Sequence, residues 1–313
     1  MSKLIEELSL EIEAEVSRLP LPSEPEGLYT PIKYIMEDGG KRMRPLLCVL
    51  ACEMFCGQAM RAKAPALAIE VFHNFTLLHD DIMDRASVRR SRPTVHTLWG
   101  DNTAILSGDA MMIFAYTLLA KSEVFDDVFA VFSRSAIEVC EGQQLDMEFE
   151  KRDSVSGDQY IEMIRLKTAS LMASALVMGA IEGGASPLEQ AALYRFGELL
   201  GLAFQIQDDR LDTYGDAATF GKNIGGDIAE GKQTFLKIVA SEAADNDHDR
   251  AVLHNSREYD QVRALYDKYG VEQLARQAIE QYYDQAIDCL AIFSPDQREH
   301  LEIYAQMILR RKK

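Results

Sequence analysis

Helical periodicity runs through almost the whole 313-residue chain and is the feature that most constrains its fold. Apolar residues recur every three or four positions, as in 46–50 and 191–200, which is the spacing of one helix face. Sustained alternation of apolar and polar residues, which would predict strands, is missing. The pattern therefore predicts an all-α, single-domain helical bundle. Breaks rich in proline and glycine divide it into roughly ten helical segments, and they fall at Pro20–Pro25, Gly39–Gly40, Gly100–Asn102, Gly183–Pro187, Gly215–Gly226 and Ser294–Pro295.

Composition narrows the class of protein. With 47% hydrophobic residues the chain can build a large core, and no Pro/Gly/Ser-rich linker divides it, so we expect one domain over residues 1–313. A formal charge of -17 argues against a nucleic-acid or anionic-membrane surface. No stretch approaches the ~20 uncharged residues of a membrane span, and the acidic N-terminus does not resemble a targeting peptide. We expect a cytoplasmic protein without an integral membrane segment.

Two copies of one acidic motif, Asp80–Asp84 and Asp208–Asp212, follow the apolar helical runs 66–78 and 196–206. The first and last aspartates of each motif share one helix face, with roughly 6 Å between their Cβ atoms. Carboxylates near the C-terminal end of a helix oppose its dipole, which indicates that a bound cation compensates them. If the two helices are neighbours, their carboxylates point across one cavity. We predict a hard divalent cation there.

Magnesium usually takes one or two protein carboxylates and completes its octahedron with water and substrate phosphates. Two opposed carboxylate pairs therefore indicate a site that clamps a diphosphate. Basic residues that such a ligand needs follow the breaks and the first motif, and arginine binds phosphate oxygens with two parallel donors. Surface salt bridges are the alternative explanation, plausible for Arg42, Arg85 and Arg92 but weaker for Lys41, Arg44, Arg89 and Arg90.

Three more lysines fit a phosphate site. Lys167 interrupts an apolar helical run, where a buried charge is costly unless it is paired, although the side chain can also extend to solvent. Lys222 and Lys232 lie in the glycine-rich segment 220–232, and an ordinary charged loop is the alternative explanation for them.

Other clusters have simpler explanations. Cys48, Cys52 and Cys56 recur every fourth residue and favour a buried apolar stripe over a thiolate metal site. Asp126–Asp127 predicts solvated helix surface. The segment 245–249 resembles the start of a calcium loop but lacks its turn glycine and its bidentate glutamate, so we expect a polar loop.

Taken in order, the matching residues of 39–232 resemble the trans-isoprenyl diphosphate synthases, the family that includes farnesyl and geranylgeranyl diphosphate synthases. The residues that carry the resemblance are Gly39-Gly40-Lys41-Arg42-x-Arg44-Pro45, His73, Leu78-His79-Asp80-Asp81-x-x-Asp84-x-x-x-x-Arg89-Arg90, Lys167-Thr168, Phe204-Gln205-x-x-Asp208-Asp209-x-x-Asp212, and Gly221-Lys222 through Asp227-x-x-x-Gly231-Lys232.

The resemblance implies an all-α fold with a central cavity, usually in a homodimer, and a Mg-dependent head-to-tail condensation. Its substrates would be isopentenyl diphosphate and an allylic diphosphate such as dimethylallyl, geranyl or farnesyl diphosphate, with three magnesium ions per site. Catalysis would rest on Asp80, Asp84, Asp208, Lys167 and Lys232.

The same resemblance assigns binding roles. Asp80, Asp84 and Asp208 would ligate magnesium, with Asp81, Asp209 and Asp212 as further ligands or in support. The allylic diphosphate would be held by Arg89, Lys167, Thr168, Gln205, Lys222 and Lys232. The isopentenyl diphosphate would be held by Lys41, Arg44, His73 and Arg90.

Product length depends on the depth of the cavity below the first motif. Phe75 and Phe72 precede Asp80 by five and eight residues, so both rings can share a face and block the growing chain, whereas Thr76 is small. A single aromatic at the fifth position resembles one group of geranylgeranyl synthases. We expect a C15 to C20 product, with C20 favoured; ordinary core packing of these rings is the alternative.

Three alternatives remain at this point. The first is a longer-chain polyprenyl diphosphate synthase. A non-catalytic subunit of a heteromeric synthase typically loses one aspartate motif, and this chain has both. A terpene cyclase or head-to-head enzyme usually has a mixed Asn/Ser/Glu second motif.

The basic end Arg310–Lys313 either closes over isopentenyl diphosphate or is a solvated terminus.

Overall fold

The computed structural model describes residues 2–37, 39–215 and 224–310, and in these ranges it is helical almost throughout. The chain forms two compact units. The first comprises Met1–Ser133, Ser174–Leu193 and Phe293–Tyr304, and the second comprises Arg134–Ala173, Tyr194–Ile292 and Ala305–Lys313. The all-α prediction is confirmed. The described strands are β1 (Val88–Arg89) and β2 (Arg92–Pro93), which pair antiparallel as a short hairpin.

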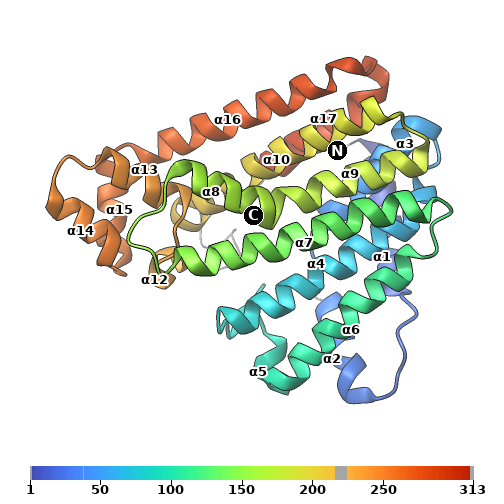
Figure 1. Cartoon of the computed structure of the whole chain (residues 1–313), viewed down its shortest axis with the longest axis horizontal. Helices are drawn as coiled ribbons and strands as arrows, with labels where there is room; N and C mark the ends of the chain where they lie inside the picture. The colour runs from blue at the N-terminus through green and yellow to red at the C-terminus, as the bar shows by residue number, and fades with distance from the viewer. Residues whose placement is uncertain (1, 38, 216–223, 311–313) are drawn as a thin grey trace. The chain divides into compact units, whose positions relative to one another are not determined.

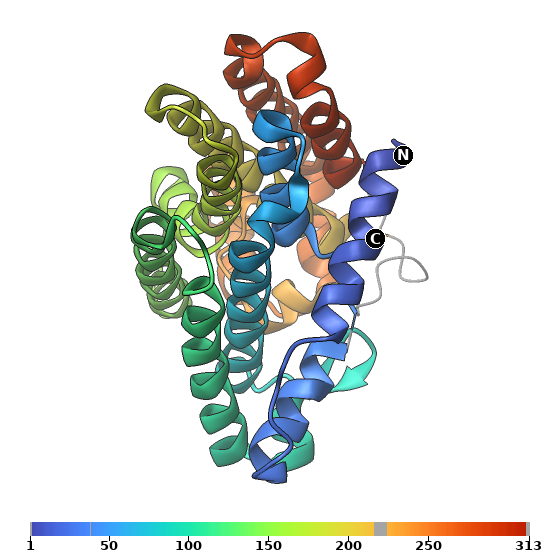
Figure 2. The same ribbon diagram turned by 90° about the vertical axis from the view of Figure 1, so that its right-hand side faces the viewer.

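The first unit is built around α4 (Lys63–Met83), which packs along α6 (Asp101–Leu119) and also contacts α3 (Met43–Cys56). Figure 2 shows α4 and α6 side by side, with the blue N-terminal helices beside them. Those N-terminal helices are α1 (Lys3–Ser17) and α2 (Glu26–Glu37). The remaining short elements of the first unit are η1 (Ala59–Ala62) and α5 (Val95–Trp99).

The second unit has a core in which α13 (Phe235–Ala243) packs against α8 (Gly157–Ile164) and α16 (Val271–Cys289). Figure 1 shows α13, α14 (Asp247–Asn255) and α15 (Tyr259–Lys268) grouped near one end of α16. The short elements of this unit are η2 (Arg165–Ala169), α12 (Gly226–Glu230) and η3 (Leu290–Ile292).

Four longer helices contribute residues to both units: α7 (Phe125–Phe149), α9 (Ser170–Gly183), α10 (Pro187–Tyr214) and α17 (Pro295–Leu309). The start of α10 follows from its sequence. Ser186 and Glu189 exchange hydrogen bonds between side chain and backbone, and Pro187 takes the first helical position, where its missing N–H costs nothing.

The described helices are more numerous than the roughly ten expected, because the chain also forms short helices beside the breaks: α5 ends just before Gly100–Asn102, and α12 begins at Gly226, the last residue of Gly215–Gly226. Two further expectations were wrong. The segment 245–249 is mostly the start of α14, with Asn246 as its N-cap, rather than a polar loop. Arg42 is no surface salt bridge: it is buried against Glu13 and Glu70.

The cysteine stripe is confirmed at Cys48 and Cys52, which are fully buried in α3, while Cys56 is half-buried. Asp126 and Asp127 are exposed on α7, as expected. Among the described helices, the stretch Gly157–Gly183 is long and apolar enough to cross a membrane, and 83% of its apolar window is buried within the protein. Burial of this kind is typical of a core helix.

Candidate active site

The first aspartate motif lies at the C-terminal end of α4. The helix ends at Met83, Asp84 is its C-cap residue, and Arg85 follows with a left-handed φ of 51°. Asp80 and Asp84 are half-buried and a turn apart, as predicted. Asp81 differs, because it is only 3% exposed and its Oδ1 accepts a hydrogen bond of 2.7 Å from Arg89 Nε.

Asp81 therefore holds β1 to α4. Burial raises the pKa of its carboxyl above the ordinary value, and the charge of Arg89 works against that rise. The two effects describe a buried carboxylate that depends on its arginine partner to stay ionised. This contact favours a positioning role for Asp81 and leaves Asp80 and Asp84 as the more accessible carboxylates of the motif.

Predicted isopentenyl-binding residues meet around His73 on α4. Arg44 Nη1 donates to His73 Nε2 at 3.0 Å, and the guanidinium of Arg90 donates to the carbonyl of Gly39. A Cβ on Gly40 would lie 3.0 Å from Arg90 Nη1, and the φ of 152° at this position favours glycine. Lys41 is exposed beside them.

This cluster concentrates positive charge in an acidic protein. Burial lowers the pKa of His73 well below its ordinary value. The charges of four arginines lower it further, in the order Arg44, Arg90, Arg89 and Arg42. A neutral imidazole among guanidinium groups is a favourable environment for an anionic ligand.

The hairpin that carries Arg89 and Arg90 is tied to α2. The guanidinium of Arg92 lies 4.0 Å above the ring centroid of Tyr34, and Tyr34 Oη donates to the carbonyl of Pro93 at 2.8 Å. The tip residues Arg90 and Ser91 both have positive φ, as a tight two-residue hairpin turn requires. The sequence had no strand signal for this hairpin.

The second aspartate motif lies in the last two turns of α10. Asp208 is half-buried, whereas Asp209 and Asp212 are buried. Asp209 Oδ2 accepts from Tyr160 Oη at 2.6 Å and from the backbone N–H of Phe235 at 2.9 Å, and its Oδ1 accepts from Gln205 at 3.0 Å. Burial, and then the charge of Asp227, raise the pKa of Asp209.

Asp212 connects the motif to the next segment. Its Oδ2 accepts from the backbone N–H of Asp227 at 3.1 Å, and its carbonyl accepts from Gly225 at 2.8 Å. Asp227 and Tyr160 were not among the predicted site residues. Asp227 belongs to a motif that carries the family resemblance but was given no role at the site, and Tyr160 had no local signal.

Lys167 lies in the π-helical segment η2, where its Nζ donates to Asp146 Oδ2 at 2.5 Å. Asp146 on α7 was also missed, since its partner lies 21 residues further along the chain. The next residue, Thr168, donates to Gln205 Oε1 at 2.9 Å. A π-turn of this kind is frequent at functional sites, and here it presents Lys167 and Thr168 together with Gln205.

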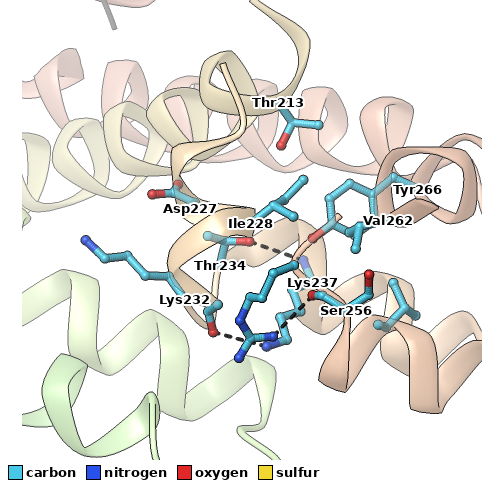
Figure 3. A pocket seen from close by; sticks show the side chains of 12 residues that line it. Thr213, Asp227, Ile228, Lys232, Thr234, Lys237, Ser256, Val262 and Tyr266 are labelled. Atoms are coloured by element: carbon cyan, nitrogen blue, oxygen red, sulfur yellow. Dashed lines mark hydrogen bonds between the residues drawn. The ribbon is translucent and has the colours of Figure 1, made fainter. Parts of the chain in front are cut away.

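Lys232 pairs with Glu230 at 3.0 Å and lines a small pocket that also contains Asp227 and Lys237. Figure 3 shows the side chain of Lys232 pointing away from Lys237 and toward the side of Asp227. Lys222 and Gly221 lie outside the described residues.

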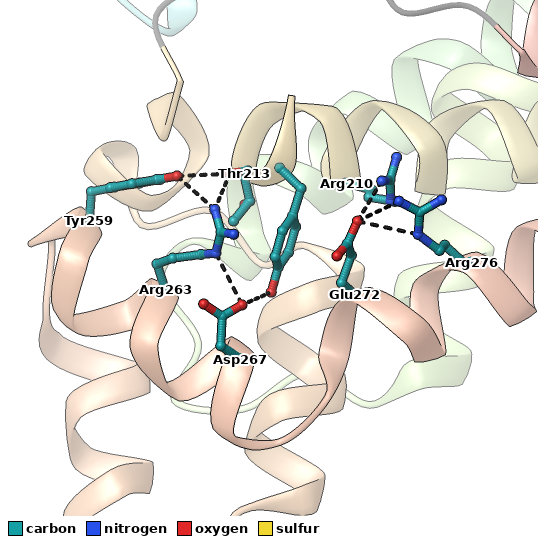
Figure 4. A network of polar contacts seen from close by, with 8 residues as sticks. Arg210, Thr213, Tyr259, Arg263, Asp267, Glu272 and Arg276 are labelled. Carbon is teal, nitrogen blue, oxygen red and sulfur yellow. Dashed lines mark hydrogen bonds and ion pairs between the residues drawn. The ribbon is translucent and has the colours of Figure 1, made fainter. Parts of the chain in front are cut away.

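The C-terminal end of α10 is braced by a polar network (Figure 4). Tyr259 Oη and Arg263 Nη1 both donate to the carbonyl of Thr213, at 2.8 and 3.0 Å, and Arg210 Nη2 donates to Glu272 Oε1 at 2.5 Å. These contacts from α15 and α16 fix the helix end that carries Asp212.

Aromatic rings fill the face of α4 that precedes the first motif. The ring centroids of Phe72 and Phe75 lie 5.3 Å apart, Phe72 packs on Phe132 at 5.3 Å, and Phe75 contacts the ring of His79 at 4.7 Å. Thr76 is half-buried and donates to the carbonyl of His73. Arg310 is exposed just after the last helix, and residues 311–313 lie outside the description.

The predicted residues thus form two sets. Asp80–Asp84 and the isopentenyl-binding set belong to the first unit, and Asp208–Asp212 with Lys167, Thr168, Gln205 and Lys232 belong to the second. Their facing arrangement stays a prediction. Over residues 2–37, 39–215 and 224–310, no three His, Cys, Asp or Glu side chains are grouped as a metal site.

Comparison with known proteins decides the family. Residues 25–269 match the family model of polyprenyl synthetases. The chain belongs to the polyprenyl synthetase family. It is 40% identical to a short chain isoprenyl diphosphate synthase of Methanothermobacter thermautotrophicus, over 92% of this chain and 91% of the relative.

Two further relatives extend the comparison. A crystal structure of a geranylgeranyl pyrophosphate synthase is 41% identical, covers 100% of both chains and superposes with a TM-score of 0.92. A geranylfarnesyl diphosphate synthase of Aeropyrum pernix is 40% identical over 67% of this chain and 69% of its own. This polyprenyl synthetase is therefore a prenyltransferase, as the motifs predicted.

Proposed function

We propose that this prenyltransferase condenses an allylic diphosphate with isopentenyl diphosphate, head to tail and with magnesium, to give mainly the C20 all-trans product within a C15 to C20 range. The observation that carries the proposal is the cationic cluster around His73, in the same unit as the Asp80–Asp84 motif. An acidic protein needs such a local cluster to bind a diphosphate.

The aspartates suit magnesium by the chemistry of their donors. Asp80 and Asp84 offer carboxylate oxygens from one helix face, and magnesium takes one or two such ligands and leaves the rest to water and phosphates. Asp208 offers a further carboxylate from α10. When bound, magnesium supplies positive charge to the departing pyrophosphate.

In this proposal the residues around the allylic diphosphate stabilise the charge that develops on ionisation. The pyrophosphate oxygens are bound by Lys167, Lys232, Arg89 and Lys222, the last of which lies outside the described residues. Thr168 and Gln205 orient the pyrophosphate through hydrogen bonds. Lys41, Arg44, His73 and Arg90 hold isopentenyl diphosphate. No protein nucleophile is needed, because the bond forms between the allylic cation and the isopentenyl double bond.

Product length is proposed from the aromatic face of α4. Phe75 and Phe72 are packed against each other, so together they form a floor below Asp80 rather than two movable rings. The geranylgeranyl relative supports C20, and the geranylfarnesyl relative makes C25 the nearest competitor. Thr76 leaves room on the side that it occupies.

Purified protein is to be incubated with labelled isopentenyl diphosphate and each allylic primer, with magnesium or with a chelator. We expect a C20 diphosphate by mass analysis and none with the chelator. Products mainly of C30 or longer would reject the assigned length, and no elongation with any primer would reject the reaction.

Asp80→Ala should lower turnover by about a hundredfold, whereas Asp126→Ala, at an exposed helical aspartate, should leave it unchanged.

We further propose a homodimer, a single folding domain over residues 1–313, and a cytoplasmic location. The exposed aliphatic side chains of α6 support the homodimer, since an apolar helix face in water favours a partner.

A further inference from the structure

Arg42 lies between two predicted phosphate-binding cations, Lys41 and Arg44, yet its own side chain points into the protein. It is 4% exposed, and its backbone has φ 43° and ψ 40°. A non-glycine residue keeps this left-handed conformation only where surrounding contacts hold it. The contacts of Arg42 therefore decide the course of the chain from Gly39 to Arg44.

Every guanidinium nitrogen of Arg42 is engaged. Nε donates to Glu13 Oε2 at 2.9 Å, Nη1 to Glu70 Oε1 at 2.7 Å, and Nη2 to the carbonyl of Met36 at 2.7 Å. These acceptors come from α1, α4 and α2 respectively. Two carboxylates thus neutralise the charge of Arg42, so it is suited to hold the loop rather than to meet an anion.

The acceptor on α4 links Arg42 to its neighbour Arg44. Glu70 and His73 are three residues apart on one face of α4, and they hold Arg42 and Arg44 respectively, at 2.7 and 3.0 Å. Asn74 donates to Glu70 Oε1 at 3.0 Å and fixes that carboxylate. The loop is therefore fastened to α4 at two successive points.

We propose that Arg42 is a positioning residue, whose pairs with Glu13 and Glu70 fix the Gly39–Arg44 loop so that Lys41 and Arg44 meet the diphosphate of isopentenyl diphosphate. This rests on the proposed function. It makes the N-terminal helix α1, through Glu13, part of the apparatus that binds one of the two substrates.

The test uses Arg42→Met/Glu70→Met, because removing both partners leaves no uncompensated buried charge. The KM for isopentenyl diphosphate should rise about tenfold or more, while the KM for the allylic diphosphate stays within about twofold. A general folding defect would change the KM values for both substrates rather than for one. Circular dichroism and the melting temperature check that the variant is folded.

Two milder variants separate geometry from charge. Arg42→Lys keeps the charge but loses the planar guanidinium that donates to several acceptors at once. The KM for isopentenyl diphosphate should therefore still rise, and a wild-type value would overturn the inference. Glu13→Gln weakens one branch at a half-exposed partner and should raise that KM about threefold. If the double variant does not fold, an unchanged KM in Glu13→Gln overturns the proposal.

The matched control is Arg298→Met/Glu302→Met, a partly exposed pair at 3.2 Å on α17 of the same unit, which should leave both KM values unchanged. Equilibrium dialysis with labelled isopentenyl diphosphate measures binding of this substrate independently of turnover. A wild type without turnover refutes the proposed function and this inference with it. A wild type that turns over, beside a folded double variant that binds isopentenyl diphosphate equally well, refutes the positioning role alone.

Discussion

At the scale of single residues, the two aspartate motifs share one arrangement. The second aspartate of each, Asp81 and Asp209, is at most 5% exposed and is held by protein donors. The first aspartate of each, Asp80 and Asp208, stays half-buried. A motif of three carboxylates can therefore use one to fix its own position and keep others for a ligand.

Lys237 shows the cost of a buried charge beside the site. It is 7% exposed, and within the described chain its ammonium donates to the carbonyl of Gly231 at 3.2 Å without a carboxylate partner. Burial, and then the charge of Arg257, lower the pKa of Lys237 to about 8. Figure 3 shows this side chain beside Ser256 and Thr234.

We predict that Lys237→Met stabilises the protein at pH 7 by about 3 kcal/mol, because burial lowers the pKa of this lysine from 10.5 to about 8. Because the folded pKa is depressed, the penalty is complete below pH 8, fades as pH rises toward 10.5, and is absent above it. Urea unfolding at pH 7 and pH 10 measures it, and the gap between variant and wild type should shrink at the higher pH.

The control is Lys268→Met, because Lys268 is half-exposed and its Nζ donates to Asp249 at 2.6 Å. This variant should gain no stability. An equal gain in both variants, or a gain for Lys237→Met that does not change with pH, would contradict the explanation by burial.

At the scale of elements, small residues let helices approach where the predicted site is built. A Cβ on Gly142 of α7 would lie 2.2 Å from the backbone nitrogen of Lys167, and one on Gly201 of α10 would lie 2.5 Å from Cα of Ala169. The π-helical segment η2 is therefore in backbone contact with both helices. Its shape depends on glycines that helix propensity disfavours.

Gly142→Ala should consequently destabilise the protein by about 1–3 kcal/mol, although propensity alone predicts a gain of about 1 kcal/mol. The displaced element carries Lys167 and Thr168, so kcat should fall as well. Chemical unfolding and steady-state kinetics measure both effects. Gly157→Ala, whose nearest atom would be 3.9 Å away, is the control; if Gly142→Ala proves equally harmless, the close contact has no role.

The sequence predicted the long helices and both aspartate motifs, because periodicity and helix-end charges are local properties. It did not predict Tyr160 as the partner of Asp209 or Asp146 as that of Lys167, which lie 49 and 21 residues away. Nor did it predict that Arg42 is buried, since a basic residue beside Lys41 and Arg44 has the same local pattern whether it faces solvent or carboxylates.

At the scale of the whole molecule, a formal charge of -17 contrasts with the cations around His73. The overall charge opposes non-specific binding of anions, while the cluster creates a local positive potential. In the proposed function, specificity for a diphosphate comes from this cluster. Raised salt should accordingly weaken substrate binding, because it screens that potential.

The proposed homodimer rests on a different surface. Leu106 and Ile113 are seven residues apart on one face of α6 and are 59% and 64% exposed, with Ile105 beside them. In a two-fold dimer the same face meets itself, so a charge placed there meets an identical charge. Leu106→Glu/Ile113→Glu should therefore halve the molar mass measured by light scattering, while the helical content is kept.

Leu10→Glu/Leu188→Glu tests whether any added acid has this effect, because both leucines are exposed on other helices of the same unit. That control should keep the mass of two chains. If the wild type has the mass of one chain, the proposed homodimer is wrong. If Leu106→Glu/Ile113→Glu keeps the mass of two chains, the interface does not lie on α6. Because α4 packs along α6, loss of the dimer should also change the product length, which mass analysis of the same variant measures.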